Sequence, residues 1–386
     1  MATYPILRAT PRTLRRSRRG SQETSLTLFP QAARHGNREY PSETSAPPLV
    51  PDRSEKPARE LVGIARLAAS SPCAEAKRGT EYFLLPVKSI LNRCDSERVP
   101  FKWTVNPYRG CEFGCRYCYA RYTHEYMELD GGDFESKIFV KQNAGELMER
   151  DLSAEKIWGE HIAIGTATDP YQPAEREFGA TRAILEKMAE REGLSLSITT
   201  KSNQVVRDIE LLQRISQRSS LTVNMSITTL RTRLARMLEP RAPRPDLRME
   251  AVQKLREAGI SAGVFAMPIL PGLTDAEKDL DALAKSARDA GAQWLGGRVL
   301  FLMPSSWKAF HAFLESKFPK LAGRYRDWYR GYGDMPKEYR ARLAAQFVEL
   351  RRKYGLGSRP DLPLKKSWQS PQLALTWEMG EERCPA

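Results

Sequence analysis

Short apolar runs alternate with longer amphipathic segments between about residues 100 and 303. The runs predict six buried strands, at 103–108, 161–166, 194–200, 221–227, 260–267 and 294–301. The segments after them predict helices at 119–127, 180–192, 205–218, 244–258 and 275–290. Strands that alternate with helices at this spacing form parallel βα units with right-handed crossovers. Eight such units would close a full barrel, so six predict an α/β fold that stays open on one side.

The flanking regions differ from this core. Residues 1–60 are rich in Pro, Ser and Thr and lack apolar periodicity, which predicts a disordered basic arm. Residues 61–100 predict a lead-in segment, in which the stretch 81–92 crosses the end of the core. Residues 304–386 predict a helical C-terminal extension. The expected domains are 1–60, 61–100, 101–303 and 304–386.

The chain of 386 residues carries a net charge of +14. Residues 1–60 hold eleven basic and six acidic side chains, a surplus of +5, so +9 falls on the remainder. This surplus fits contact with a polyanion, although a solvated basic surface explains it equally well. The arm also has the composition of an organellar transit peptide, which leaves an address tag as a second interpretation. No run of eighteen apolar residues occurs, so no membrane span is expected.

The stretch that carries the chemistry is 106–119, which reads NPYRGCEFGCRYCY. Its cysteines, Cys111, Cys115 and Cys118, fall within eight residues. Thiolates are soft ligands that favour zinc, copper(I) or iron–sulfur clusters. Two glycines in the stretch supply the backbone freedom that a compact loop needs. Three ligands would leave one coordination position of a bound metal centre open.

The other cysteines, Cys73, Cys94 and Cys384, are scattered without the spacing of a disulfide framework. We therefore expect a reducing, cytoplasmic compartment, which suits exposed thiolate ligands. A structural zinc knot completed by His124, Cys94 or Cys73 is the alternative to an open metal centre. Against it, nothing nearby has the spacing of a zinc finger or ribbon.

The Cys-x3-Cys-x2-Cys spacing, with aromatic Tyr117 before the last cysteine, resembles the signature of the radical SAM enzymes. The flanking NPYRGC and the later TDPYQPAE at 168–175 resemble the spore photoproduct lyase-like branch, which is labelled DNA repair photolyase-related. This resemblance implies a partial (βα)6 TIM-like barrel. It also implies that the three cysteines hold three irons of a 4Fe-4S cluster, whose fourth iron binds S-adenosylmethionine. An external reductant such as ferredoxin or flavodoxin would be needed.

The same resemblance implies four residues that contact the cofactor: Tyr117, Thr168, Lys201 and Ser226. Lys201 and Ser226 stand at the carboxyl ends of the third and fourth predicted strands, where the chemistry of parallel barrels gathers. They are similar to the lysine and serine that meet the methionine moiety in spore photoproduct lyase. For Lys201, a surface lysine at a strand end is the alternative. A helix N-cap formed by Thr168 or Asp169 explains the loop 168–175 equally well.

Three further features lie outside these motifs. Glu239 and Arg241 are expected to pair and brace the loop after strand four, with a substrate-binding role as the alternative for Arg241. Residues 324–332 interleave arginines with aromatics, which suits nucleic acid. We prefer a helix that packs its aromatics on the core with its arginines outside. His311 is expected on a helix face.

The resemblance therefore implies a radical SAM, lyase-like enzyme that forms a 5′-deoxyadenosyl radical. The resemblance and the basic charge favour a nucleic-acid substrate, and a lesion in a duplex would have to be flipped out. The lesion-repairing lyases carry a hydrogen-donating cysteine where this chain has Thr166, which argues against photoproduct lyase activity itself. A tRNA, a peptide or a small molecule stays open as substrate, and no catalytic side chain is predicted. A metal- or cluster-containing nucleic-acid-binding protein without turnover is the alternative.

Overall fold

The computed structural model describes residues 61–77, 79–95, 99–154, 157, 159–330 and 333–359. Its centre is a seven-stranded sheet with the order β11-β10-β9-β8-β7-β4-β3. The strands that run parallel are β4 (Trp103–Val105), β7 (His161–Ile164), β8 (Ser195–Thr200), β9 (Ser220–Ser226), β10 (Ala262–Ile269) and β11 (Leu295–Val299). An antiparallel edge strand, β3 (Leu91–Arg93), pairs with β4. Because β3 and β11 form opposite edges, the sheet is an open six-unit barrel, as the sequence predicts.

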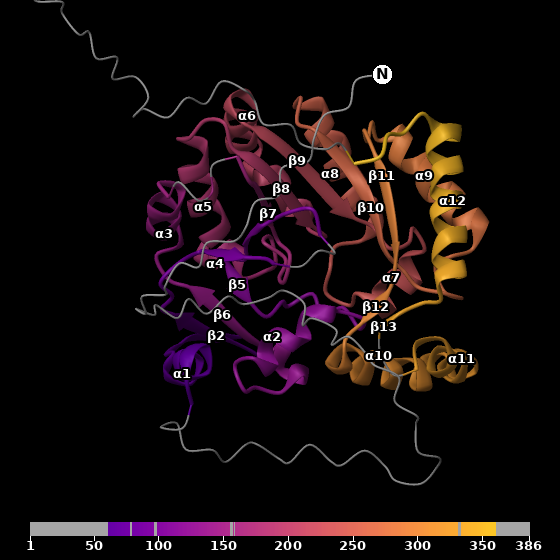
Figure 1. The fold of residues 1–386 in the computed structure, drawn as a ribbon, viewed down its shortest axis with the longest axis horizontal. Coiled ribbons are helices and arrows are strands. Elements are labelled where there is room, and N and C mark those ends of the chain that lie inside the picture. The colour runs from indigo at the N-terminus through magenta and orange to yellow at the C-terminus, as the bar shows by residue number, and fades with distance from the viewer. Residues whose placement is uncertain are drawn as a thin grey trace, which may run out of the picture.

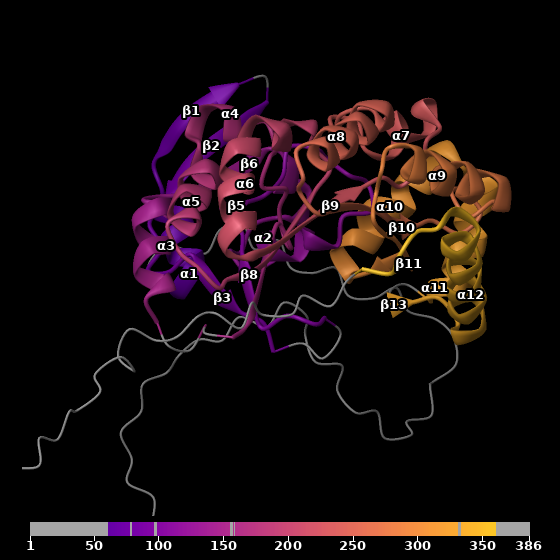
Figure 2. The same cartoon turned by 90° about the horizontal axis from the view of Figure 1, so that it is seen from above.

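Helices cover the outer side of this sheet (Figure 2). They are α3 (Ala144–Leu152), α4 (Glu175–Phe178), α5 (Ala180–Ala189), α6 (Ile209–Arg218), α7 (Thr232–Leu238), α8 (Pro245–Glu257) and α9 (Glu277–Asp289). The longer ones bury apolar side chains; in α6, for example, Leu211, Leu212 and Ile215 are buried. Strand residues such as Val223 and Val264 are fully enclosed, as expected for parallel strands covered on both faces.

A second sheet of four strands lies beside the barrel, and the sequence reasoning missed it. Its order is β1 (Cys73–Lys77), β2 (Thr80–Leu85), β6 (Lys137–Lys141) and β5 (Tyr108–Arg109). The segment 81–92 therefore contributes one strand to each sheet instead of crossing the end of the core. The predicted strand 103–108 is likewise divided, with β4 in one sheet and β5 in the other. Pro107 lies at the division, and it has no N–H with which to continue a ladder.

The first helix, α1 (Gly63–Ser70), precedes this sheet, and a short α2 (Tyr122–Glu125) follows the cysteine loop. The C-terminal extension consists of α10 (Pro304–Lys317), α11 (Pro319–Tyr329) and α12 (Lys337–Tyr354), with a small pair of strands, β12 (Phe301–Leu302) and β13 (Gly333–Asp334). Figure 1 shows α10 and α11 at the end toward which β9 and β10 run. The hydroxyls of Tyr325 and Tyr329 donate to Pro271 O and Leu300 O, in the loops after β10 and β11.

The described part of the arginine and aromatic segment belongs to α11, whose Tyr325 and Tyr329 are buried. The preferred interpretation, aromatics packed on the core, is confirmed. His311 lies on α10, with its Nδ1 3.5 Å from Glu315, so its place on a helix face is confirmed too. The basic arm 1–60 and Cys384 lie outside the described residues. Within the described residues, no helix is long and apolar enough to cross a membrane.

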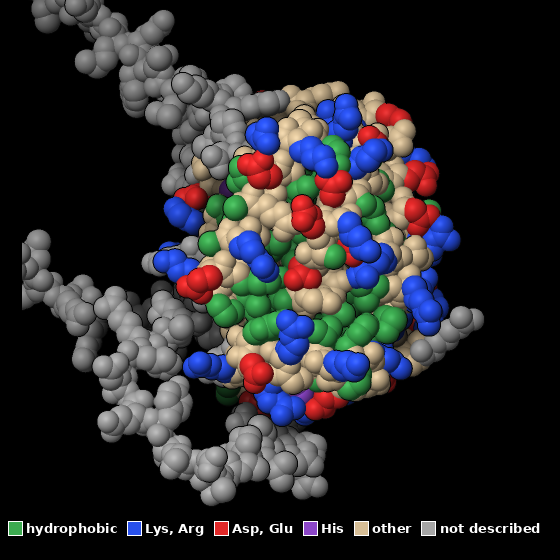
Figure 3. All heavy atoms as spheres, turned by 90° about the vertical axis from the view of Figure 1, so that its right-hand side faces the viewer, with side chains coloured by type: hydrophobic (Ala, Val, Ile, Leu, Met, Phe, Trp, Pro, Cys, Tyr) green, Lys and Arg blue, Asp and Glu red, His purple; other side chains and the backbone are tan. Residues whose placement is uncertain are grey.

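The face formed by α9, α11 and α12 carries basic and acidic side chains interspersed around an apolar band (Figure 3). Several of the basic groups are paired there: Lys353 lies 2.6 Å from Asp281, and Lys285 lies 2.8 Å from Asp289. On this face the positive surplus therefore does not form one continuous basic surface.

Candidate functional site

The cysteine loop connects β5 to a turn of 3-10 helix at Tyr119–Arg121. Gly110 begins it with φ of +83°, and a Cβ there would stand 2.7 Å from the carbonyl oxygen of Lys137. Only glycine fits this close approach in the left-handed region. The N–H of Cys111 donates to Phe134 O at 2.9 Å, which ties the loop to the segment before β6.

None of the three loop thiols forms a disulfide; Cys111 and Cys115 are buried and Cys118 is partly exposed. Burial raises the pKa of each thiol, because a thiolate without a counter-charge is poorly solvated in the interior. Two buried thiols and one partly exposed thiol on one tight loop fit a soft metal centre, whose positive charge would replace the protons.

Among the described residues, no three His, Cys, Asp or Glu side chains converge on one single-ion site. His124 instead places its Nε2 2.9 Å from Lys137 O, and burial lowers its pKa to about 4. Thiolates that bind separate irons of a cluster do not need to converge on one point, so the finding does not bear on a cluster.

The second motif, residues 168–175, is held against the cysteine loop by hydrogen bonds, and we call this motif the clasp. Thr168 donates its hydroxyl hydrogen to Gly110 O at 2.6 Å, and Gln172 Nε2 approaches the same oxygen at 3.2 Å. Gln172 Oε1 in turn accepts from the N–H of Glu112, and the Glu112 carboxylate accepts from the N–H of Ala174. Four contacts across about sixty residues of sequence therefore fix the backbone at Gly110 and Glu112.

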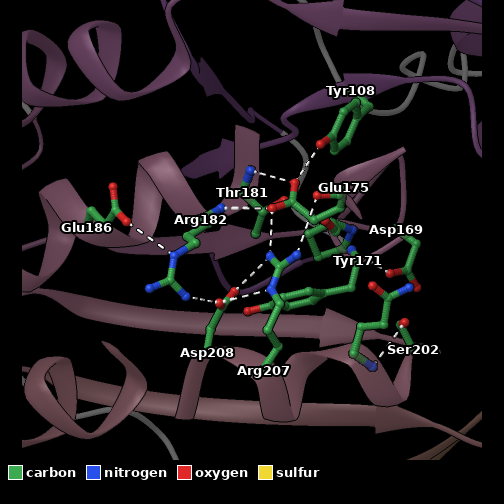
Figure 4. A network of polar contacts seen from close by, with 12 residues as sticks. Tyr108, Asp169, Tyr171, Glu175, Thr181, Arg182, Glu186, Ser202, Arg207 and Asp208 are labelled. Carbon is green, nitrogen blue, oxygen red and sulfur yellow. Dashed lines mark hydrogen bonds and ion pairs between the residues drawn. The ribbon is translucent and has the colours of Figure 1, made fainter. Parts of the chain in front are cut away.

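Glu175 anchors the far end of this clasp (Figure 4). Its fully buried carboxylate accepts from the hydroxyl of Tyr108, the N–H of Thr181 and a guanidinium nitrogen of Arg207. Arg207 also pairs with buried Asp208. A buried carboxylate is stable only if all of its hydrogen-bond donors stay in place. Glu175 therefore fixes the relative positions of β5, α5 and the turn before α6.

Asp169 joins the second motif to the end of β8. Its carboxylate accepts from the Thr200 hydroxyl and from the N–H of Lys201, both at 2.7 Å, and from the N–H of Tyr171 at 2.9 Å. The backbone of Lys201 is thereby fixed, and its side chain is largely buried. Lys201 is therefore not the exposed strand-end lysine of the alternative interpretation.

Glu239, which follows α7, lies at the centre of the predicted cofactor residues. Arg248 forms an ion pair with it at 2.6 Å, and Lys201 Nζ lies 3.9 Å away. The hydroxyls of Tyr117 and Thr228 both donate to Glu239 Oε1. Burial alone would raise the pKa of Glu239, but the charges of Arg248 and Lys201 bring it below the ordinary value. Burial alone would lower the pKa of Lys201, and the Glu239 charge raises it above the ordinary value.

The expected pair of Glu239 with Arg241 is wrong, because Glu239 pairs with Arg248 from α8. Arg248 Nε and a terminal nitrogen also donate to Pro243 O and Ser226 O, so this guanidinium spans the loop and the end of β9. The Arg241 side chain lies over the cysteine loop, where a Cβ on Gly114 would stand 3.6 Å from one of its nitrogens. Arg241 is close to Glu239 in the sequence, but the packing of α8 makes Arg248 its ion-pair partner.

The N-cap interpretation of Thr168 and Asp169 is also wrong. The helix after this loop, α4, has Ala174 at its N-cap and no side-chain cap. The Thr168 hydroxyl donates to Gly110 O and accepts from Gln172, so the contacts of Thr168 lie within the clasp.

Three of the four predicted cofactor residues are brought together, while Thr168 lies on Gly110. Tyr117, Lys201 and the backbone of Ser226 connect through Glu239 and Arg248, next to Cys115, whose charge would also interact with Lys201. Sequence reasoning missed Arg248 and the role of Glu239 as their common partner. Thr166, at the end of β7, hydrogen bonds to Asn106 and accepts from the Tyr119 hydroxyl through its carbonyl oxygen.

A model of the radical SAM superfamily matches residues 105–284, which contain the cysteine loop, the motif 168–175 and β7 to β10. The chain belongs to the radical SAM superfamily. The family implies a 4Fe-4S cluster and S-adenosylmethionine, and the loop with its three thiols fits that cluster.

Curated relatives cover most of the chain. An uncharacterized protein of Mycobacterium tuberculosis is 34% identical over 307 residues, which span 79% of this chain and 89% of the relative. An uncharacterized protein of Acidianus two-tailed virus is 29% identical over 264 residues, spanning 66% of this chain and 80% of the relative.

Among solved structures, the fold is similar to that of spore photoproduct lyase. A complex of that enzyme with dinucleoside spore photoproduct matches with a TM-score of 0.55 and 17% identity, over 71% of this chain and 80% of that chain. A variant with bound AdoMet and the same dinucleoside matches with a TM-score of 0.55 and 15% identity, over 78% of this chain and 87% of that chain. At this identity the likeness concerns the fold.

Proposed function

We propose that the protein is a radical SAM enzyme that holds its cluster through Cys111, Cys115 and Cys118 and acts on a nucleic-acid substrate. The observation that carries the proposal is the convergence of the cysteine loop, Lys201 and Glu239 at the carboxyl end of the barrel strands. When bound, the cluster and S-adenosylmethionine supply a 5′-deoxyadenosyl radical that abstracts hydrogen from a substrate.

The chain's own residues would bind and orient the cofactor. Lys201 remains charged beside Glu239, and its ammonium suits the carboxylate of a methionine moiety as a point charge. Tyr117 fixes its hydroxyl on Glu239 and turns an edge of its ring toward Phe310 of α10. Ser226 would contact the same methionine moiety from β9. Thr168 would position the cysteine loop through its hydrogen bond to Gly110 O. Burial of Cys111 and Cys115 would limit the access of water to the reacting groups.

The nucleic-acid substrate is supported by the basic surplus of the chain and by the fold shared with an enzyme solved with a dinucleoside photoproduct. The reaction would differ from photoproduct repair, because Thr166 stands where the lyases have their hydrogen-donating cysteine. Its hydroxyl cannot return hydrogen to a carbon radical as a thiol does, and it is engaged with Asn106.

Anaerobic reconstitution with iron and sulfide tests the proposal. We expect about four iron and four sulfide ions per chain, the composition of a 4Fe-4S cluster. Under a strong reductant, the loaded protein should convert S-adenosylmethionine to methionine and 5′-deoxyadenosine. A full cluster without any 5′-deoxyadenosine would instead favour the alternative of a cluster-containing nucleic-acid-binding protein without turnover.

A further inference from the structure

A cavity where the barrel meets the second sheet contains two cationic side chains that the cofactor site does not use. Arg109 of β5 and Lys141 of β6 line it, together with Asn106 and Tyr122, and it measures about 490 Å³ with its open mouth included. No acidic residue is among those that line it. We call it the Arg109–Lys141 cavity.

The register of the two strands places these cations side by side. Arg109 pairs with Phe139 across the antiparallel β5–β6 ladder, and Lys141 lies two residues beyond Phe139 on the same strand. Paired residues and residues two apart share one face of a sheet, so Arg109 and Lys141 are diagonal neighbours. Two like charges at that spacing repel each other, unless an anion lies between them.

Neither cation has an acidic partner in the described part of the chain. Lys141 is only 4% exposed, and the charge that favours its ammonium form is that of Asp151. That carboxylate is already occupied by the Ser89 hydroxyl and the N–H groups of Ile90 and Leu91. Arg109 has a buried Nε without any hydrogen-bond acceptor. Buried charges and donors are normally paired, so this arrangement indicates a missing acceptor.

The remaining wall fits a phosphate group with an organic substituent. A guanidinium presents a fork of donors that matches phosphate oxygens, and an ammonium adds a point charge. Asn106 and Thr104 offer neutral polar groups. Tyr122 and the exposed Tyr126 meet edge to face at 5.3 Å, and Tyr126 also lines the cavity. An aromatic mouth suits a sugar or a base attached to the phosphate.

The cavity adjoins the end of β7, close to the proposed reaction site. Asn106 belongs to its wall and accepts from the N–H of Ala167 at 2.7 Å, beside Thr166. Tyr122 stacks on Tyr119, the residue after Cys118, with 6.4 Å between the ring centroids. A phosphate held here would therefore lie one layer of side chains away from the cysteine loop.

We propose that the Arg109–Lys141 cavity is a phosphate-binding site, which takes a phosphate group of a nucleic-acid backbone or of a free nucleotide. The pKa of Lys141, which burial and Arg109 lower to about 7, would rise once such an anion is bound. Phosphate binding at this cavity needs neither the cluster nor S-adenosylmethionine, so it can be measured apart from turnover.

The experiment is calorimetric titration of the full chain, loaded with its cluster under anaerobic conditions, at fixed ionic strength. The titrants are AMP, a short single-stranded DNA oligonucleotide and inorganic phosphate. Lys141→Met removes the buried charge at nearly constant size, Lys141→Arg restores a cation, and Lys88→Met removes an exposed lysine as the matched control. Loss of one charge-assisted contact should weaken binding about tenfold or more.

We expect AMP or the oligonucleotide to bind more tightly than inorganic phosphate, Lys141→Met to lose that binding, and Lys141→Arg and Lys88→Met to keep it. Binding of the oligonucleotide without AMP would assign the site to a nucleic-acid backbone, and binding of AMP without the oligonucleotide would assign it to a free nucleotide. The assignment is wrong if none of the three titrants binds, or if Lys141→Met and Lys88→Met lose the same affinity. Formation of 5′-deoxyadenosine by Lys141→Met separates this failure from a failure of the radical chemistry.

Discussion

Glu239 Oε2 lies 2.6 Å from a guanidinium nitrogen of Arg248, and both side chains are almost completely enclosed by protein. A buried ion pair contributes little net stability compared with apolar residues, but removal of one partner leaves an uncompensated charge in the interior. Because Lys201 and Tyr117 depend on the same carboxylate, this pair couples the stability of the barrel end to the geometry of the cofactor site.

Glu239→Gln should therefore destabilise the protein by about 3–5 kcal/mol, the cost of an unpaired buried charge. Glu250→Gln, the same substitution in an exposed pair with Lys254 on α8, should cost less than about 1 kcal/mol. Urea denaturation measures both. Under conditions where both variants are folded, affinity for S-adenosylmethionine should fall only in Glu239→Gln, since Lys201 and Tyr117 lose the carboxylate that positions them. Equal stability of the two variants would contradict the pairing.

Lys201→Ala and Ser226→Ala should each weaken binding of S-adenosylmethionine while iron content stays constant. A lost hydrogen bond is worth on the order of 1–3 kcal/mol, so affinity should fall at least several-fold. Equilibrium dialysis with labelled cofactor measures the change, and Lys102→Ala, at an exposed ion pair with Glu160, serves as the control. Full affinity in both site variants would remove these residues from the cofactor site.

Replacement of Cys111, Cys115 or Cys118 by Ala, one at a time, should abolish the brown chromophore or leave a defective cluster. A triple replacement of Cys73, Cys94 and Cys384 should keep it, because these thiols lie outside the loop. Visible absorption and iron analysis after anaerobic reconstitution report the result. If the triple variant loses the cluster while single loop variants retain it, the ligands have been assigned wrongly.

The barrel was predictable because its strands are short apolar runs that any sheet must bury. Long amphipathic helices separate most of these runs. The second sheet was not predictable from the sequence, because β2 and β6 pair across more than fifty residues. No local sequence pattern indicates which distant strand will pair with β2. Within the site, the cysteines are recognisable from spacing alone. The ion-pair partner of Glu239 cannot be recognised from the sequence, because nearby Arg241 and more distant Arg248 carry the same guanidinium group. Only the packing of α8 distinguishes them.

Gly110→Ala should destabilise the cysteine loop. The new Cβ would stand 2.7 Å from Lys137 O and 2.9 Å from Phe134 O, which are backbone atoms, and φ of +83° strains any other residue. We expect a loss of more than about 1 kcal/mol and incomplete loading of the cluster. Gly323→Ala is the control, because it lies in α11 with open space at its Cβ and should be neutral or stabilising. Normal cluster loading in Gly110→Ala would show that the loop can relax.

Lys141→Met should make the ligand-free protein more stable at neutral pH. The pKa of Lys141 falls from its ordinary 10.5 to about 7 in the folded state, chiefly because of burial. Between these two values the unfolded chain holds a proton that the folded chain has released, so stability rises with pH across that interval. Below about pH 7 Lys141 is protonated in both the folded and the unfolded state. The folded protein then bears the full cost of a buried ammonium, on the order of a few kcal/mol of stability. Met carries no charge, so the advantage of the variant should be greatest at pH 7 or below and should fade toward pH 10. Urea denaturation of both proteins at pH 7 and pH 9 measures this difference. An advantage that does not change between the two pH values would mean that Lys141 keeps an ordinary pKa in the fold, and that an acceptor already satisfies its charge.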